Sequence, residues 1–101
     1  MKEIKKISEQ IDAELEDAAK YLKCAYKHKA TNPILADMYY KLSLAEMEHV
    51  AILHEAGVKL IDDYASKNAI PEGMKAVYDY LHERHIKWAN KIRTRQDEYQ
   101  R

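Results

Sequence analysis

Two glutamates and one histidine occupy positions where the chain otherwise places apolar side chains. Alternating steps of three and four residues trace one face of a helix. Over residues 4–28 these steps give Ile4, Ile7, Ile11, Glu14, Ala18, Tyr21, Ala25 and His28. Over residues 35–60 they give Leu35, Tyr39, Leu42, Glu46, His49, Leu53, Ala56 and Leu60. We therefore expect Glu14, Glu46 and His49 to point toward a core, among aliphatic side chains.

A carboxylate among apolar side chains is costly unless a cation or hydrogen bonds compensate its charge. A divalent metal compensates it directly, because carboxylate oxygens and imidazole nitrogens are ordinary metal ligands. Glu46 and His49 form a Glu-x-x-His step, which places both side chains on one side of a single helical turn. The alternative without a metal is a buried Glu–His pair, or a glutamate hydrogen-bonded to a tyrosine of the core. Glu16 and Glu48 fall off the stripes and are expected to be exposed.

Long helices must position these residues. The 101 residues include only two glycines and two prolines, which favours an all-α chain and argues against a sandwich or barrel with many turns. Breaks are expected at Asn32-Pro33 and at residues 68–71, since the residue before proline resists the helical conformation. We predict one domain over residues 1–101, with helices over about residues 2–29, 34–66 and 72–100.

An antiparallel turn near residue 31 would bring Glu14 and Glu46 to a similar height. Glu14 lies about 17 residues before that turn and Glu46 about 15 after it, so their heights agree within roughly one helical turn. The chain is too short for a bundle of four helices of about 25 residues each. It must therefore complete a core with three helices or share a core with a partner.

Charge and composition exclude several classes of function. The 17 Lys and Arg balance the 17 Asp and Glu, so neither a nucleic acid nor an anionic membrane surface is an expected partner. The chain has no Gly-rich phosphate loop and no recognisable nucleophile motif. A single cysteine, Cys24, cannot form an internal disulfide, which predicts a cytoplasmic location and an inert packing role.

Three further histidines have less specific interpretations. His28 ends the first predicted helix, where a protonated imidazole suits the helix dipole. His82 and His85 are interpreted as part of a solvated or tyrosine-partnered face, with an accessory role in metal entry as the alternative.

The two glutamate-bearing segments resemble the ferritin-like superfamily over about residues 8–56. Glu14 is followed seven residues later by Tyr21, a spacing shared with that superfamily. Residues 39–54 read YYKLSLAEMEHVAILH and are similar to the second helix of rubrerythrins and encapsulated ferritins, where a Glu-x-x-His-Ala-x-x-Leu run is usual. In full-length members each half of a four-helix bundle supplies one Glu and one Glu-x-x-His, and the two halves enclose two irons.

The resemblance implies a ferritin-like helical hairpin with a third, C-terminal helix, which completes a four-helix bundle by forming a homodimer or a higher homo-oligomer. It assigns Glu14 and Glu46 as carboxylate ligands, with Glu46 a candidate bridge, and His49 as the nitrogen ligand. Tyr21 would donate a hydrogen bond to a carboxylate, or else simply pack in the core. The dimer would hold two irons, and the chemistry would be the oxidation of Fe(II) by O₂ or peroxide, so a ferroxidase-type oxidoreductase is the expected enzyme.

The sequence also departs from these relatives. Residues 93–101 are polar and do not resemble the tail that targets a protein to an encapsulin shell. The additional carboxylates and the rubredoxin cysteine domain of rubrerythrins are not found in this sequence. Two alternatives therefore stay open: a helical module for oligomerisation or partner binding that has lost its metal, and a scaffold that binds Zn or Mn without redox chemistry.

Overall fold

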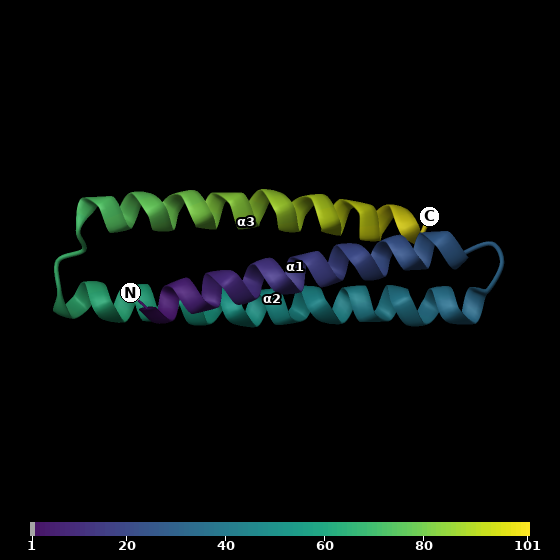
Figure 1. Ribbon diagram of the computed structural model, residues 1–101, viewed down its shortest axis with the longest axis horizontal. Helices are drawn as coiled ribbons and strands as arrows, with labels where there is room; N and C mark the ends of the chain where they lie inside the picture. The colour runs from purple at the N-terminus through teal and green to yellow at the C-terminus, as the bar shows by residue number, and fades with distance from the viewer. Residues whose placement is uncertain (1) are drawn as a thin grey trace.

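Three helices joined by two short connections make up the fold (Figure 1). The computed structural model describes residues 2–101. Helix α1 spans Lys2–His28, α2 spans Pro33–Lys67 and α3 spans Glu72–Tyr99. The all-α prediction is confirmed, since no strand occurs over the described chain. Each helix end lies within one residue of its predicted position.

Local chemistry explains where the helices begin and end. The Asn32 side chain caps α2 by accepting a hydrogen bond from the Leu35 amide at 3.2 Å, and Pro33 occupies the first turn, where a missing N–H has little cost. At the other end of α2, the Asn68 amide donates to the Tyr64 carbonyl at 2.9 Å. Pro71 then precedes the first turn of α3.

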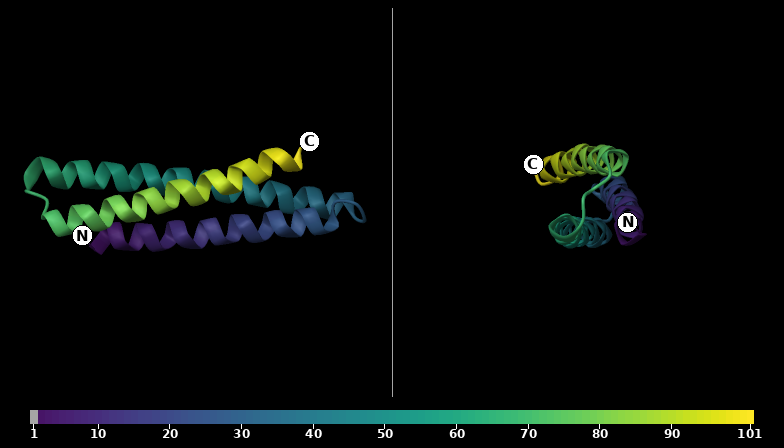
Figure 2. Two further views of the ribbon diagram at one scale, coloured as in Figure 1. Left: turned by 90° about the horizontal axis from the view of Figure 1, so that it is seen from above. Right: turned by 90° about the vertical axis from the view of Figure 1, so that its left-hand side faces the viewer.

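The helices run side by side along an elongated molecule of 56 × 18 × 17 Å. Helix α1 packs closely along α2, and α3 contacts α1 more than it contacts α2. The end-on view of Figure 2 shows α1 adjacent to both other helices. None of the helices in residues 2–101 combines the length and the apolar character that crossing a bilayer requires.

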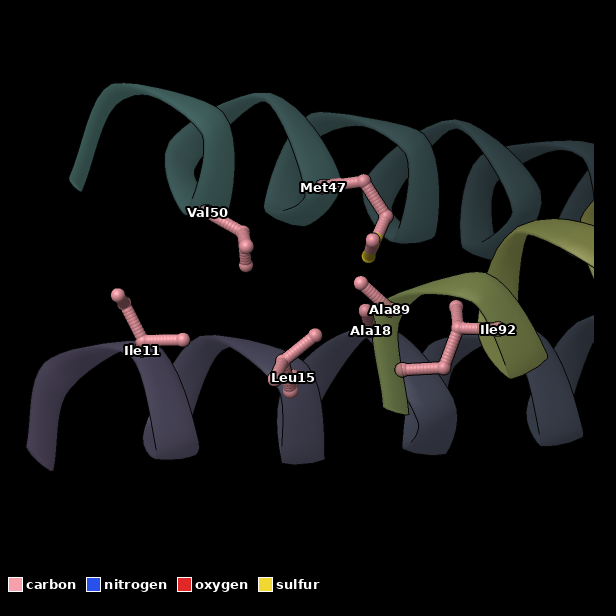
Figure 3. Close-up of a cluster of buried hydrophobic side chains, with 7 residues drawn as sticks. All are labelled: Ile11, Leu15, Ala18, Met47, Val50, Ala89 and Ile92. Carbon is pink, nitrogen blue, oxygen red and sulfur yellow. The ribbon is translucent and has the colours of Figure 1, made fainter. Parts of the chain in front are cut away.

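All three helices contribute to the main hydrophobic cluster (Figure 3). Its buried members are Ile11, Leu15 and Ala18 from α1, Met47 and Val50 from α2, and Ala89 and Ile92 from α3. A second cluster toward the α1–α2 turn contains Leu22, Ala25 and Tyr40. Burial of these apolar side chains is the main force that holds the hairpin and α3 together.

The predicted core face of α1 is confirmed in part. Ile11, Ala18 and Ala25 are buried, but the largest fully buried aliphatic side chains are Leu15 and Leu22, which the stripe left out. The centre of the core face is therefore rotated toward these two leucines. Glu14 is half-buried at the edge of the face and is not at its centre.

The predicted core face of α2 is wrong by one position. None of the eight residues of the stripe over residues 35–60 is buried. The buried residues each come one position later: Ala36, Tyr40, Ser43, Met47, Val50 and Gly57. Helix α2 is apolar on two sides, and the stripe that carries Glu46 and His49 lies beside the core, where it is half-buried or exposed. We call these eight residues, from Leu35 to Leu60, the α2 stripe.

Polar contacts fix both halves of α3. Toward its C-terminus, Gln96 Nε2 donates to Ser43 Oγ at 2.9 Å, and Ser43 Oγ donates to the Ala18 carbonyl at 2.8 Å. Toward its N-terminus, Asp12 Oδ1 accepts from Arg84 Nη2 at 2.9 Å and lies 2.7 Å from His85 Nε2. His85 is buried, so its assignment to a solvated or tyrosine-partnered face is wrong: its partner is the Asp12 carboxylate.

Candidate metal centre

Glu14, Glu46 and His49 come together on the α1–α2 hairpin. Each offers one ligand atom, and these three atoms lie within 4.8 Å of one another. His49 Nδ1 lies 3.5 Å from Glu14 Oε2 and 3.5 Å from Glu46 Oε2. They form the single group of three or more such ligand-type side chains in residues 2–101.

Helix geometry explains the convergence. Glu46 and His49 are three residues apart and therefore share one side of one turn of α2. The antiparallel connection at residues 29–32 brings Glu14 of α1 beside them, which confirms the predicted similarity in height. What the sequence did not predict is the exposure: the His49 side chain is 53% exposed, against 27% for Glu14 and 15% for Glu46.

The two carboxylates are poorly satisfied by protein groups. Glu46 Oε2 is buried and has no hydrogen-bond partner. The two 3.5 Å separations from His49 Nδ1 exceed the 2.7–2.9 Å expected of a charge-assisted hydrogen bond. A protonated His49 would pair with both glutamates across these distances, which is the arrangement expected without a metal. The same three atoms, two carboxylate oxygens and one imidazole nitrogen, fit a divalent cation that contacts each of them.

The group lies on the side of the hairpin away from α3. Asp12 contacts α3, and Glu14 is two residues further along α1, a rotation of about 200°. On α2, Tyr40 contacts α3 through the Gln96 carbonyl at 3.3 Å, and His49 is nine residues further, which is about half a turn away. The hairpin therefore has one face covered by α3 and one face, the open face, that carries the three ligand-type side chains.

Exposed apolar side chains also lie along α2 on and beside the α2 stripe. Leu42, which precedes Glu46 by one turn in the α2 stripe, is 37% exposed. Next to the stripe, Ile34, Met38 and Ile52 are also exposed. Exposed apolar patches next to polar groups mark interaction sites. The sequence indicates this surface through the second apolar side of α2, but periodicity alone assigns that side to the internal core.

The other predicted site residues have separate surroundings. The Tyr21 ring stacks on Tyr39, with centroids 6.2 Å apart. The hydrogen bonds recorded for residues 2–101 include none from Tyr21 to a carboxylate, so its role as a hydrogen-bond donor stays a prediction. His28 stacks on the same Tyr39 at 6.1 Å and lies in the last turn of α1. Cys24 is a free thiol of intermediate burial.

No family model, curated protein or solved structure matches this chain.

Proposed function

We propose that this chain is an iron-binding, ferritin-like protein of the reducing cytoplasm, in which Glu14, Glu46 and His49 form half of a di-iron site. A second copy of the chain supplies the other half, and the completed site oxidises Fe(II) with O₂ or peroxide. The observation that carries the proposal is the convergence of these three ligand-type side chains on an open face, with a buried carboxylate oxygen that lacks a partner.

The number of ligands argues for a shared site. One carboxylate from each of Glu14 and Glu46, with one nitrogen from His49, leaves the coordination of an octahedral ion incomplete. A two-fold axis on the open face would double the set to four carboxylates and two imidazoles, the same count that a di-iron bundle takes from four helices.

The open face also has the character of an interface between copies. Leucines of the α2 stripe and the exposed Ile34, Met38 and Ile52 would be covered by a second hairpin. Covering them removes apolar surface from water and at the same time lowers the dielectric constant around the carboxylates. The attraction between cation and carboxylate is stronger in such surroundings, so assembly and metal binding support each other.

Each ligand has a distinct role in this proposal. Glu46 is the least exposed of the three and would be the candidate carboxylate shared between two ions. Glu14, from the other helix, closes the site from the side, and His49 is the terminal nitrogen ligand. Fe(II) is the substrate, and two ions held about 3.5–4 Å apart can share the electrons that one oxidant molecule takes up.

The experiment is an anaerobic Fe(II) titration of the full chain, with metal counted per chain and absorbance followed after oxygen is added. We expect about one iron per chain and an absorbance change that depends on oxygen. The variants Glu14→Ala and His49→Ala should lose the bound iron. The matched control is Glu48→Ala, an exposed glutamate one position before His49, which should bind as the parent does.

Each of the other results has a defined meaning. Failure of the parent chain to bind Fe(II) would overturn the proposal and favour a helical oligomerisation or partner-binding module. Retention of Zn or Mn, without an oxygen-dependent change after iron loading, would favour a scaffold without redox chemistry. Equal binding by Glu14→Ala and Glu48→Ala would place the iron elsewhere on the chain.

A further inference from the structure

A second cluster of titratable side chains joins all three helices on the covered side of the hairpin. The His54 ring of α2 stacks on the His82 ring of α3, with centroids 4.7 Å apart and planes 19° apart. His82 also stacks on Tyr78, one turn earlier in α3, at 5.9 Å. His85 reaches the Asp12 carboxylate of α1 from the next turn.

The three histidines line one small cavity of about 40 Å³. Its other walls are mostly apolar: Ile4, Ile7, Ile11, Gly57 and Leu81, with Ser8 and Tyr78 as additional polar side chains. In such surroundings a charged His54 imidazole loses much of its hydration, and the neutral form of His54 is favoured.

Charges of both signs face this cluster. From α1, Asp12 is the acid in contact with it, and that carboxylate is already shared by Arg84 and His85. From α3, Arg93 lines the adjacent groove, together with His54 and His85. Asp62 and Asp79 lie near Tyr78 and, after burial, contribute to raising the pKa of its phenol. In the described part of the chain, Asp12 forms its ion pairs with Arg84 and His85, and no carboxylate forms an ion pair with His54 or His82.

The stacked pair joins the N-terminal half of α3 to α2, whereas the Asp12 contacts with Arg84 and His85 join it to α1. Helix α3 touches α2 at few places. Its C-terminal half is held by the hydrogen bonds of Gln96 with Ser43 and Tyr40, whereas the aromatic contact between α2 and its N-terminal half is the His54–His82 stack.

We propose that His54 and His82 form a pH-sensitive latch, which holds the N-terminal half of α3 on the hairpin at neutral pH and releases it in mild acid. The latch does not involve Glu14, Glu46 or His49, so it goes beyond the proposed function and does not depend on it. Release would uncover the apolar lining of the cavity, including Ile7 and Ile11.

The direction of the pH effect follows from linkage. Burial, and then the nearby His82 and His85, lower the pKa of His54 from its ordinary 6.5. When a histidine has a lower pKa in the folded state, the unfolded or released state binds more protons below that ordinary value. The contribution of a neutral His54 to the docked state is therefore fully present above about pH 6.5 and is lost as the pH falls through and below that value.

The test is amide hydrogen–deuterium exchange of the full chain at about pH 7.5 and about pH 5.5, with rates corrected for intrinsic chemical exchange. We expect exchange in the N-terminal half of α3 to accelerate by about tenfold or more in acid. Protection in the hairpin core, around Leu15 and Met47, should persist.

The variants identify the groups responsible. The double variant His54→Gln/His82→Gln should lose the acceleration, and His54→Gln alone should lose most of it if the double variant does not fold. His28→Gln is the matched control, because His28 also stacks on a tyrosine but lies in the last turn of α1, away from the cavity. Exchange in this variant should accelerate in acid as it does in the parent. The latch would be overturned if exchange in α3 of the parent did not change with pH, or if all three helices lost protection together. It would also be overturned if His54→Gln showed the same acceleration in acid as the parent.

Discussion

At the scale of single residues, Glu46 is the side chain whose surroundings most favour a bound cation. One of its oxygens is buried without a hydrogen bond, while its nearest ring nitrogen, on His49, lies 3.5 Å away. If position 46 served only for packing, a leucine would suit it better than a glutamate, and the α2 stripe already contains several leucines. We therefore expect Glu46 to decrease the stability of the metal-free chain.

Replacing Glu46 with leucine should make the metal-free chain more stable. The Glu46→Leu variant removes a buried, unpaired carboxylate oxygen, and we expect the free energy of unfolding to rise by about 1–2 kcal/mol. Urea unfolding of metal-free protein measures this change at fixed protein concentration. Added Mn(II) or Fe(II) should raise the midpoint for the parent but not for the variant, because the variant lacks a ligand.

The control for that substitution is Glu48→Leu, at an exposed position two residues away. Its effect on stability should stay within about 0.5 kcal/mol, and its response to metal should match that of the parent. A clear loss of stability in metal-free Glu46→Leu would instead show that the carboxylate has a structural partner, and would count against the metal site.

The meeting of Glu14, Glu46 and His49 could be predicted from sequence because it depends on regular geometry: one helical turn and one antiparallel connection. The contact between Asp12 and His85 could not be predicted in this way. These residues are 73 positions apart, and their contact depends on how α3 rotates against α1, which no local pattern fixes.

At the scale of helices, the two proline-containing breaks were sufficient to predict all three elements. The phase of α2 was not predictable, because Leu42, Leu53 and Leu60 are as apolar as the truly buried Met47 and Val50. Periodicity identifies an apolar side but does not tell whether the same chain or another copy covers it. The one-position error in the core face is therefore what a second interaction surface on α2 would produce.

A substitution at Gly57 tests how closely α1 and α2 approach each other. A Cβ atom added there would meet Ile7 Cγ2 at 3.7 Å, an ordinary van der Waals contact. Because glycine weakens a helix interior, Gly57→Ala should raise the free energy of unfolding by about 0.5–1 kcal/mol. Thermal or urea unfolding measures this value.

Gly73→Ala provides the comparison, since Gly73 has no neighbour within 4 Å of an added Cβ and lies in the first turn of α3. Gly73→Ala should raise the free energy of unfolding by less than Gly57→Ala does, because helix ends fray and depend less on helix propensity. If Gly57→Ala lowered the free energy of unfolding while Gly73→Ala did not, the gap between α1 and α2 at Gly57 would be narrower than the 3.7 Å contact indicates.

At the scale of the whole molecule, the hairpin separates two kinds of surface. Helix α3 covers one face and contributes Ala89 and Ile92 to the core. The opposite, open face carries the three ligand-type side chains Glu14, Glu46 and His49, together with exposed apolar side chains such as Leu42. The proposed second hairpin would cover this open face and complete a four-helix bundle.

Native mass spectrometry of the chain loaded anaerobically with Fe(II) tests most directly whether two copies share one metal site. We predict a species, or a multiple of it, that contains two chains and two irons, and predict that His49→Ala loses the irons. Leu42→Lys, which charges the α2 stripe without removing a ligand, should shift the population toward metal-poor monomer, whereas the neighbouring Leu44→Lys, off the stripe, should not. A stable monomer that holds an iron pair would contradict the account.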